Sequence, residues 1–232
     1  MMKYLATLKY QALTVAAAMT AISGGLASAQ SYPVAPPGTS VTLQPGDFFQ
    51  SVPQSVDLNY PLGGTVIGDN LYQHPGGVLG KLGGYDPSAY LIGVFGGLVD
   101  INSTTSSVYL WESGGGNVGP AGESGPQVVL GYWNGQSFRS YGNSVQAIYQ
   151  DTGVSFFEYD MQYFIHSSII PLSDFQITGD PILNAVMISS GGPGSDSRLT
   201  AAASNTVPEP STMLLLGVAF IALLGYWSTT GR

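Results

Sequence analysis

The stretch that decides the fold is VVLGYWNGQSFRSY, residues 128–141. Two runs rich in β-branched and aromatic side chains flank Asn134-Gly135, and such residues favour extended strands. Asn and Gly both accept positive φ, so this pair predicts a type I′ turn between antiparallel strands. The stretch therefore predicts a β-hairpin near the middle of the chain.

The same pattern continues on both sides of this hairpin. SVYLWE, residues 107–112, predicts a strand before a Gly/Pro-rich loop, and 144–148 with 154–159 predict a strand pair around Asp151-Thr152-Gly153. The chain has 32 glycines, short apolar segments recur about every dozen residues, and none of the body shows a helical period. These features predict an all-β domain of the sandwich or barrel type over residues 30–189.

The charges of the body exclude some classes of partner. Its basic residues are Lys81, Arg139 and Arg198, whereas only Glu209 of the chain's 14 acidic residues lies outside it. Nucleic acids and anionic lipid surfaces both require clusters of Lys or Arg, so neither is expected as a partner. The chain has no cysteine, which excludes thiolate catalysis and thiolate metal sites.

Residues 1–29 have the features of a secretory signal peptide. Lys3 and Lys9 precede a weakly apolar segment, and Ala27-Ser28-Ala29 forms an A-x-A cleavage site before Gln30. We expect passage through the Sec translocon and cleavage after Ala29. The alternative is an uncleaved N-terminal anchor, which the Ala, Gly and Ser content disfavours.

The end of the chain combines a proline-flanked acid with an apolar run. Val207-Pro208-Glu209-Pro210 precedes the uncharged residues 213–227, and Arg232 ends the chain. Residues 212–228 are predicted to form a transmembrane helix of about 26 Å, a length tolerated by a bilayer that thins locally. Residues 190–206, rich in Gly, Ser and Ala, are predicted to be a flexible linker.

Residues 207–232 resemble the PEP-CTERM sorting signal of exopolysaccharide-producing Gram-negative bacteria. The resemblance rests on the hexapeptide VPEPST, the apolar run and the basic end, although a single Arg232 stands where an arginine cluster is usual. It implies that an exosortase, a membrane cysteine protease-transpeptidase, cuts an inner-membrane precursor near Pro208-Glu209-Pro210. The body would then reach the cell surface or the extracellular space. An ordinary membrane anchor is the alternative.

Part of the body has a second resemblance. Residues 96–100, 108–112, 128–138 and 181–186 are similar to the jelly-roll, galactose-binding type of β-sandwich found in bacterial surface proteins. The resemblance implies one jelly-roll-like sandwich domain. It says little about a ligand, since one fold supports many functions.

Few residues suggest catalysis. The two histidines, His74 and His166, are interpreted as a loop residue and a strand-end residue, and no G-x-S-x-G elbow occurs in the body. Residues 114–119 match G-x-G-x-x-G, but no helix is expected to follow, so we interpret them as a loop. A secreted hydrolase therefore has almost no support.

Two kinds of binding site remain as hypotheses. A structural calcium ion would draw on carboxylates among Asp100, Glu112, Asp160 and Asp180, although the spacing resembles neither an EF-hand nor an Asp-box. Exposed aromatic rings would form a platform for sugar rings, with Trp111, Tyr132 and Trp133 as the residues concerned. The alternative without a binding site is that the carboxylates are solvated and the aromatic side chains fill the core.

We therefore expect an exported, non-enzymatic protein of the cell surface or extracellular matrix, associated with extracellular polysaccharide and without a cofactor apart from calcium. A carbohydrate-binding module is the second hypothesis. An exposed Trp111 or Trp133 beside polar side chains would favour that module, whereas burial of both would disfavour it.

Overall fold

The structure is a computed structural model that describes residues 29–56, 80–81, 89–116, 118–119, 121–158, 160–190 and 198–207. Its described part is built from strands with two short 3₁₀ helices, which confirms the all-β prediction. The elements are β1 (Gln30–Val34), β2 (Thr39–Leu43), η1 (Pro45–Asp47), β3 (Phe49–Val56), β4 (Gly80–Lys81), β5 (Tyr90–Phe95), β6 (Leu98–Val99), β7 (Ser107–Gly114), β8 (Glu123–Trp133), β9 (Phe138–Glu158), β10 (Met161–Pro171), η2 (Leu172–Phe175), β11 (Ala185–Ser189), β12 (Arg198–Leu199), β13 (Ala201–Ser204) and β14 (Thr206–Val207).

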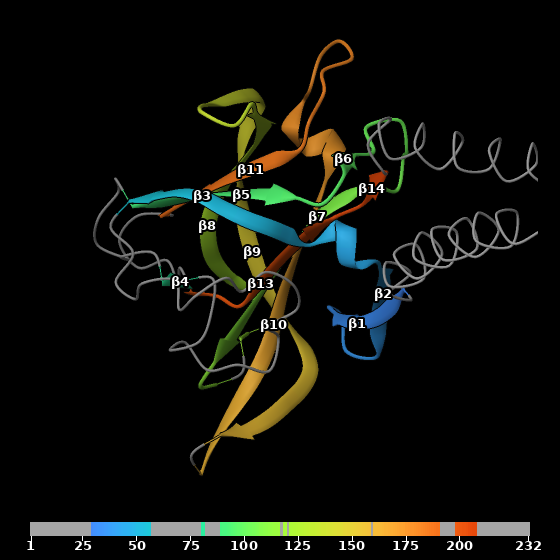
Figure 1. Cartoon of the computed structure of the whole chain (residues 1–232). Helices are drawn as coiled ribbons and strands as arrows, with labels where there is room; N and C mark the ends of the chain where they lie inside the picture. Colours follow the sequence, from blue (N-terminus) through green and yellow to red (C-terminus); the bar gives the residue numbers. More distant parts are fainter. Residues whose placement is uncertain are drawn as a thin grey trace, which may run out of the picture.

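Eight strands form one antiparallel sheet in the order β13-β7-β10-β9-β8-β11-β5-β3. The sheet curls strongly, so that its two halves face each other (Figure 1). The edges come close enough for Phe48, just before β3, to form an isolated bridge with Ala203 of β13. This curled shape is consistent with the predicted sandwich, because both halves bury one face in a shared core.

Strand β7 lies between two layers of apolar side chains, and all eight of its residues are buried. Val108 and Leu110 point into the main core, which contains side chains from both halves of the sheet. Tyr109 and Trp111 alternate with them and point into a second cluster beneath the β1–β2 ribbon. The alternation explains why this stretch is apolar on both faces.

The second cluster is aromatic and is centred on Trp111. Its ring centroid lies 6.2 Å from that of Phe48, and the Tyr32 and Phe48 centroids are 5.0 Å apart. The indole Nε1 donates to the carbonyl oxygen of Pro33 at 2.7 Å. Trp111 is 0% exposed. These contacts fasten the β1–β2 ribbon to the sheet.

The central hairpin is present, but its turn differs from the predicted type. Trp133 pairs with Phe138, which leaves four residues in the loop rather than two. Of Asn134 and Gly135, only Gly135 has positive φ, at 95°. The Asn134 side-chain oxygen instead accepts from the backbone N–H groups of Gln136 and Ser137, each at 2.9 Å. This side-chain cap replaces the backbone geometry of a type I′ turn.

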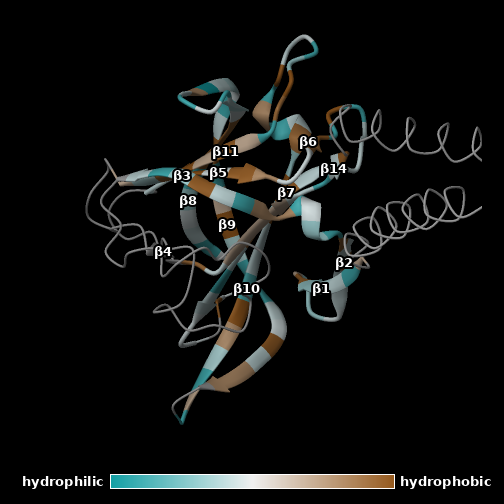
Figure 2. Ribbon diagram, in the orientation of Figure 1, coloured by the Kyte–Doolittle hydropathy of each residue, from teal (hydrophilic) through white to brown (hydrophobic). Residues whose placement is uncertain are grey.

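The predicted turn at Asp151-Thr152-Gly153 is wrong, because β9 runs through it as one strand of 21 residues. The chain bends here at an irregularity: Gly153 has φ of 74°, and the β9–β10 register shifts between Ile165 and His166. Thr152 donates to the carbonyl oxygen of Ile165 at 2.7 Å and so fixes the bulge. Beyond it, the β9–β10 hairpin projects from the molecule, with alternating apolar and polar residues (Figures 1 and 2).

The prediction that residues 190–206 form a flexible linker is wrong for residues 198–206. Residues 198–207 form β12, β13 and β14, and β13 is the edge strand that pairs with β7. Ala201, Ala202 and Ala203 are at most 1% exposed. Their small side chains let β13 approach the large rings of β7, a role that composition alone does not distinguish from flexibility.

Candidate functional site

The predicted sorting motif begins inside the folded domain. Val207 is the last residue of β14, where it pairs with Leu98, and its side chain is 43% exposed. Pro208, Glu209 and Pro210 lie outside the described residues, as does Ala27 of the predicted N-terminal cleavage site. Ala29 and Gln30 are exposed, and Gln30 is the first residue of β1.

A buried carboxylate holds the strand that leads into this motif. Asp47, at the end of η1, is 6% exposed. Its Oδ1 accepts from both the backbone N–H and the hydroxyl of Thr206, each at 2.8 Å, and its Oδ2 accepts from the N–H of Gln44 at 2.7 Å. We call Asp47, Thr206 and Gln44 the Asp47 clip. The Pro45-Gly46-Asp47 segment gives a local turn signal, but nothing in the sequence indicates its partner 159 residues later.

The three aromatic residues proposed as a sugar platform do not come together. The inclusion of Trp111 is wrong, because its ring lies in the aromatic core. Tyr132 and Trp133 are both half-buried, and adjacent residues of a strand point to opposite faces. Asn184 fastens the end of β8, since its side-chain oxygen accepts from the Trp133 N–H at 2.8 Å.

Tyr132 instead lines a surface hollow with residues that were not among the predicted site residues. The hollow has a volume of about 560 Å³. Its other lining residues are Asn134, Ser137, Arg139, Tyr141 and Ile182. They come from the two arms and the turn of the central hairpin and from the segment before β11. The sequence does indicate that two of these residues share a face of the sheet. Arg139 and Tyr141 are two positions apart on one strand, so their side chains point to the same side.

The hollow combines rings, a cation and an exposed aliphatic side chain. The Arg139 guanidinium carbon lies 5.1 Å from the centroid of the Tyr141 ring. Within the part of the chain that the structure describes, Arg139 has no salt bridge. Ile182 is 60% exposed. Such a surface can stack on the apolar face of a sugar while donating hydrogen bonds to hydroxyl or carboxylate oxygens.

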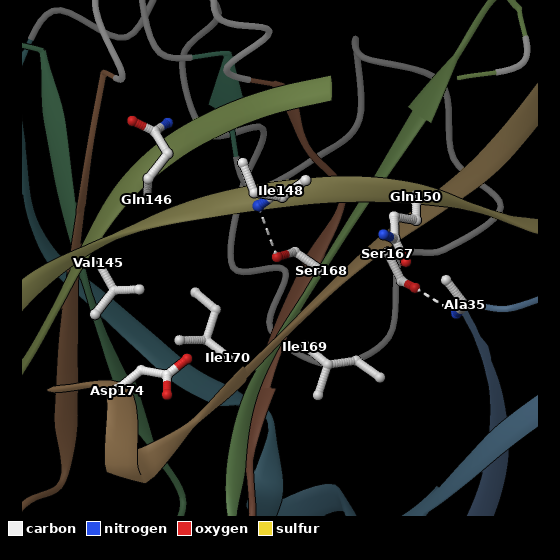
Figure 3. A pocket seen from close by; sticks show the side chains of 10 residues that line it. All are labelled: Ala35, Val145, Gln146, Ile148, Gln150, Ser167, Ser168, Ile169, Ile170 and Asp174. Atoms are coloured by element: carbon white, nitrogen blue, oxygen red, sulfur yellow. Dashed lines mark hydrogen bonds between the residues drawn. The ribbon is translucent and has the colours of Figure 1, made fainter. Parts of the chain in front are cut away.

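A second, smaller cavity lies where β9 and β10 separate. The two strands pair up to Ser167 and Gln150, and beyond this point each follows a different neighbour. The gap holds a pocket of about 240 Å³ (Figure 3). In it, the Ser168 hydroxyl accepts from the N–H of Ile148 at 3.0 Å, and the Ser167 hydroxyl accepts from the N–H of Ala35 at 2.8 Å. Ser168 thus satisfies a β9 backbone group that the separated strands leave unpaired, whereas Ser167 joins β10 to the residue that follows β1.

His166 occupies the middle of β10 and not a strand end, which corrects the prediction for this residue. It lies opposite Glu112 of β7, and its Nδ1 is 2.8 Å from the Glu112 Oε1. Both side chains are buried. Burial lowers the pKa of His166, but the hydrogen bond and charge of Glu112, the charge of Asp151 and the Gly116 backbone together raise the pKa above the ordinary 6.5. The pair is shielded from any substrate in bulk solvent.

The predicted calcium donors occupy separate settings. Glu112 faces His166 in the interior, whereas Asp160 lies in the turn between β9 and β10 with φ of 60°. Asp100 accepts from the N–H of Asn102 at 3.2 Å, and Asp180 lines a loop hollow. Among the residues described, no group of three or more His, Cys, Asp or Glu side chains could hold a metal ion.

The comparison with protein families identifies one segment. Residues 206–228 match the PEP-CTERM protein-sorting motif, so the chain carries the sorting signal that the sequence indicated. No curated protein and no solved structure matches the chain. Within the described ranges between residues 29 and 207, no helix is long and apolar enough to cross a membrane; the predicted span at 212–228 lies outside them.

Proposed function

We propose that this protein is a non-enzymatic component of the cell surface or extracellular matrix, delivered by exosortase and retained among extracellular polysaccharide. The observation that carries the proposal is the PEP-CTERM motif at residues 206–228. A protein that bears this motif is processed by an exosortase and ends outside the cell. The precursor would be held in the inner membrane by residues 212–228 until it is cut.

Two properties of the body support a structural role. The buried Glu112–His166 pair joins neighbouring strands where no substrate can reach it. The body also has no cysteine and only three basic residues, whereas all but one of the chain's 14 acidic residues lie in it, so repulsion between molecules would keep it soluble after export.

The proposal is tested by replacing Pro208, Glu209 and Pro210 with alanine in a strain that contains exosortase. The variant is expected to stay uncut in the inner membrane, whereas the wild type is cut and released or attached outside. Ser211→Ala serves as the matched control, since it leaves the three motif residues intact. Equal processing of the triple variant and the wild type would remove the basis of the proposal.

The hollow beside Tyr132 favours a second candidate function, the binding of carbohydrate. Tyr132 and Tyr141 offer ring faces, and Arg139 offers a planar set of donors suited to a uronic acid carboxylate. A polysaccharide carrying such sugars is therefore the ligand class that this surface fits. Binding would retain the released body in the matrix without a covalent bond.

Affinity electrophoresis of the purified body in gels containing acidic or neutral polysaccharide tests this function. We expect retardation by the acidic polysaccharide, and Tyr132→Ala or Arg139→Gln should weaken it about tenfold, which corresponds to about 1.4 kcal/mol. Tyr90→Ala removes a half-buried tyrosine outside the hollow and should bind normally. Equal migration of all variants in every gel would exclude the hollow as the binding site.

A further inference from the structure

The first two residues of the matched sorting segment belong to a strand of the folded body. Thr206 pairs with Val99 and Val207 pairs with Leu98, which places both in the β14–β6 ladder. The preceding residue is also fixed, because the Asn205 carbonyl accepts from the Asp100 N–H at 3.0 Å and its side chain accepts from the Ser107 N–H at 3.1 Å. The motif is therefore continuous with the fold.

The Asp47 clip holds this strand in place. One buried carboxylate oxygen accepts two hydrogen bonds from Thr206, and the other oxygen ties the same carboxylate to Gln44. Hydrogen bonds to a buried ionised group are among the stronger ones in proteins. Gly97 allows the close approach, because a Cβ atom there would lie 2.6 Å from the Val207 carbonyl oxygen.

Only a short tether separates the clip from the apolar run. Residues 208–212 connect Val207 to Met213. Fully extended, this tether reaches about 20 Å. While the clip is closed, the end of β14 must therefore stay within that distance of the first apolar residue, near which the membrane-bound enzyme would act.

We propose that the Asp47 clip is a gate on processing: exosortase engages the motif only after Thr206 leaves Asp47 and β14 leaves β6. This inference rests on the proposed processing by exosortase. Enzymes that bind an extended peptide pair with its backbone N–H and carbonyl groups, and a strand that is already paired with β6 cannot offer the same groups. Opening the clip also lengthens the tether by releasing residues 205–207, which gives the enzyme room.

A disulfide between positions 99 and 206 would lock the gate. Their backbone N–H groups donate elsewhere, Val99 to Leu183 and Thr206 to Asp47, so the two residues form a non-hydrogen-bonded antiparallel pair. Cα atoms of such pairs lie about 4.5 Å apart, within the range for a disulfide. The chain has no cysteine of its own, so the new thiols have no other partner in the protein.

The experiment follows precursor cleavage in the exosortase-bearing strain for the full chain with Val99→Cys and Thr206→Cys together. The locked precursor is expected to be cut at least about tenfold more slowly than either single variant, because the disulfide keeps β14 from leaving β6. Adding a membrane-permeant reductant should restore the rate of the single variants. Asp47→Asn and Gly97→Ala weaken the clip without changing the motif, and both should be cut faster than the wild type.

The outcomes separate the two proposals. If the locked precursor is cut equally fast before and after reduction, the gate is excluded although processing by exosortase stands. The gate is also excluded if Asp47→Asn and Gly97→Ala are cut no faster than the wild type. If the wild type and the Pro208, Glu209 and Pro210 triple variant are cut alike, the proposed function itself fails.

Discussion

The buried side chains of Glu112 and His166 form a pair that links two neighbouring strands of the sheet. A buried charge is costly unless an opposite charge and hydrogen bonds compensate for it. Here the two side chains lie directly opposite each other on β7 and β10, and Asp151 adds negative charge from β9. The pair therefore works as a cross-strand contact inside the sheet, although its residue types are also those of a catalytic site.

The raised pKa of His166 predicts that stability falls as the pH rises. Protonated His166 is favoured by the folded state, so the stabilisation is complete below the unfolded pKa of 6.5 and is lost as the pH rises through the higher folded pKa. Urea denaturation across this window should show the free energy of unfolding decreasing with pH. In Glu112→Gln, this decrease should disappear, and the variant should be about 3–5 kcal/mol less stable, as expected when a buried pair is broken. A wild-type profile that rises with pH over the same window would contradict the assignment.

Gly93 provides a second prediction at the residue scale. A Cβ atom at this position would lie 2.2 Å from the buried ring of Phe49. Gly93→Ala should therefore destabilise the protein by about 1–3 kcal/mol, the usual cost of overpacking a core. Gly115→Ala is the control, since a Cβ atom there would have no neighbour within 4 Å. Equal midpoints of thermal unfolding for the two variants would show that Phe49 moves aside without cost.

At the scale of elements, local patterns predicted strands well and their partners poorly. Asn134-Gly135 indicated the central hairpin, because the turn chemistry is contained in the sequence next to it. Gly153 gave the same kind of signal but produces a bulge, since the pairing with β10 keeps the strand continuous. The edge strand β13 was missed because Ala201–Ala203 become buried only through the distant rings of β7. The partner of Asp47 was missed for the same reason.

Truncation tests the assignment of the C-terminal strands. Residues 30–207 should unfold cooperatively, whereas residues 30–199 should melt at a clearly lower temperature or fail to fold. The physical reason is that removing β13 and β14 uncovers the edge of β7 and leaves Asp47 buried without Thr206. Differential scanning calorimetry of both proteins supplies the comparison. Equal melting temperatures would mean that this segment is a linker after all.

For the whole molecule, the hollow beside Tyr132 and the Asp47 clip, the two surfaces to which functions are proposed, lie on different sides. The hollow is formed around the turn of the β8–β9 hairpin, at the top of Figure 1, whereas β14 lies beside β6 to the right. A body held at β14 near the membrane would therefore keep the hollow clear of the processing enzyme. The sequence predicted the delivery route because the sorting motif is local, but the hollow and the clip depend on long-range pairing that a single sequence does not show.

The most direct test of the account is the intact mass of the exported protein purified from a strain that contains exosortase. The account predicts a chain that begins at Gln30 and ends within or next to the Pro208-Glu209-Pro210 motif, without the apolar run at 213–227, apart from any group added at the new end. The same strain without exosortase should yield a membrane-bound protein that keeps Arg232. An exported protein whose mass includes Arg232 would contradict the central claim, because the C-terminal segment would then be a permanent part of the protein.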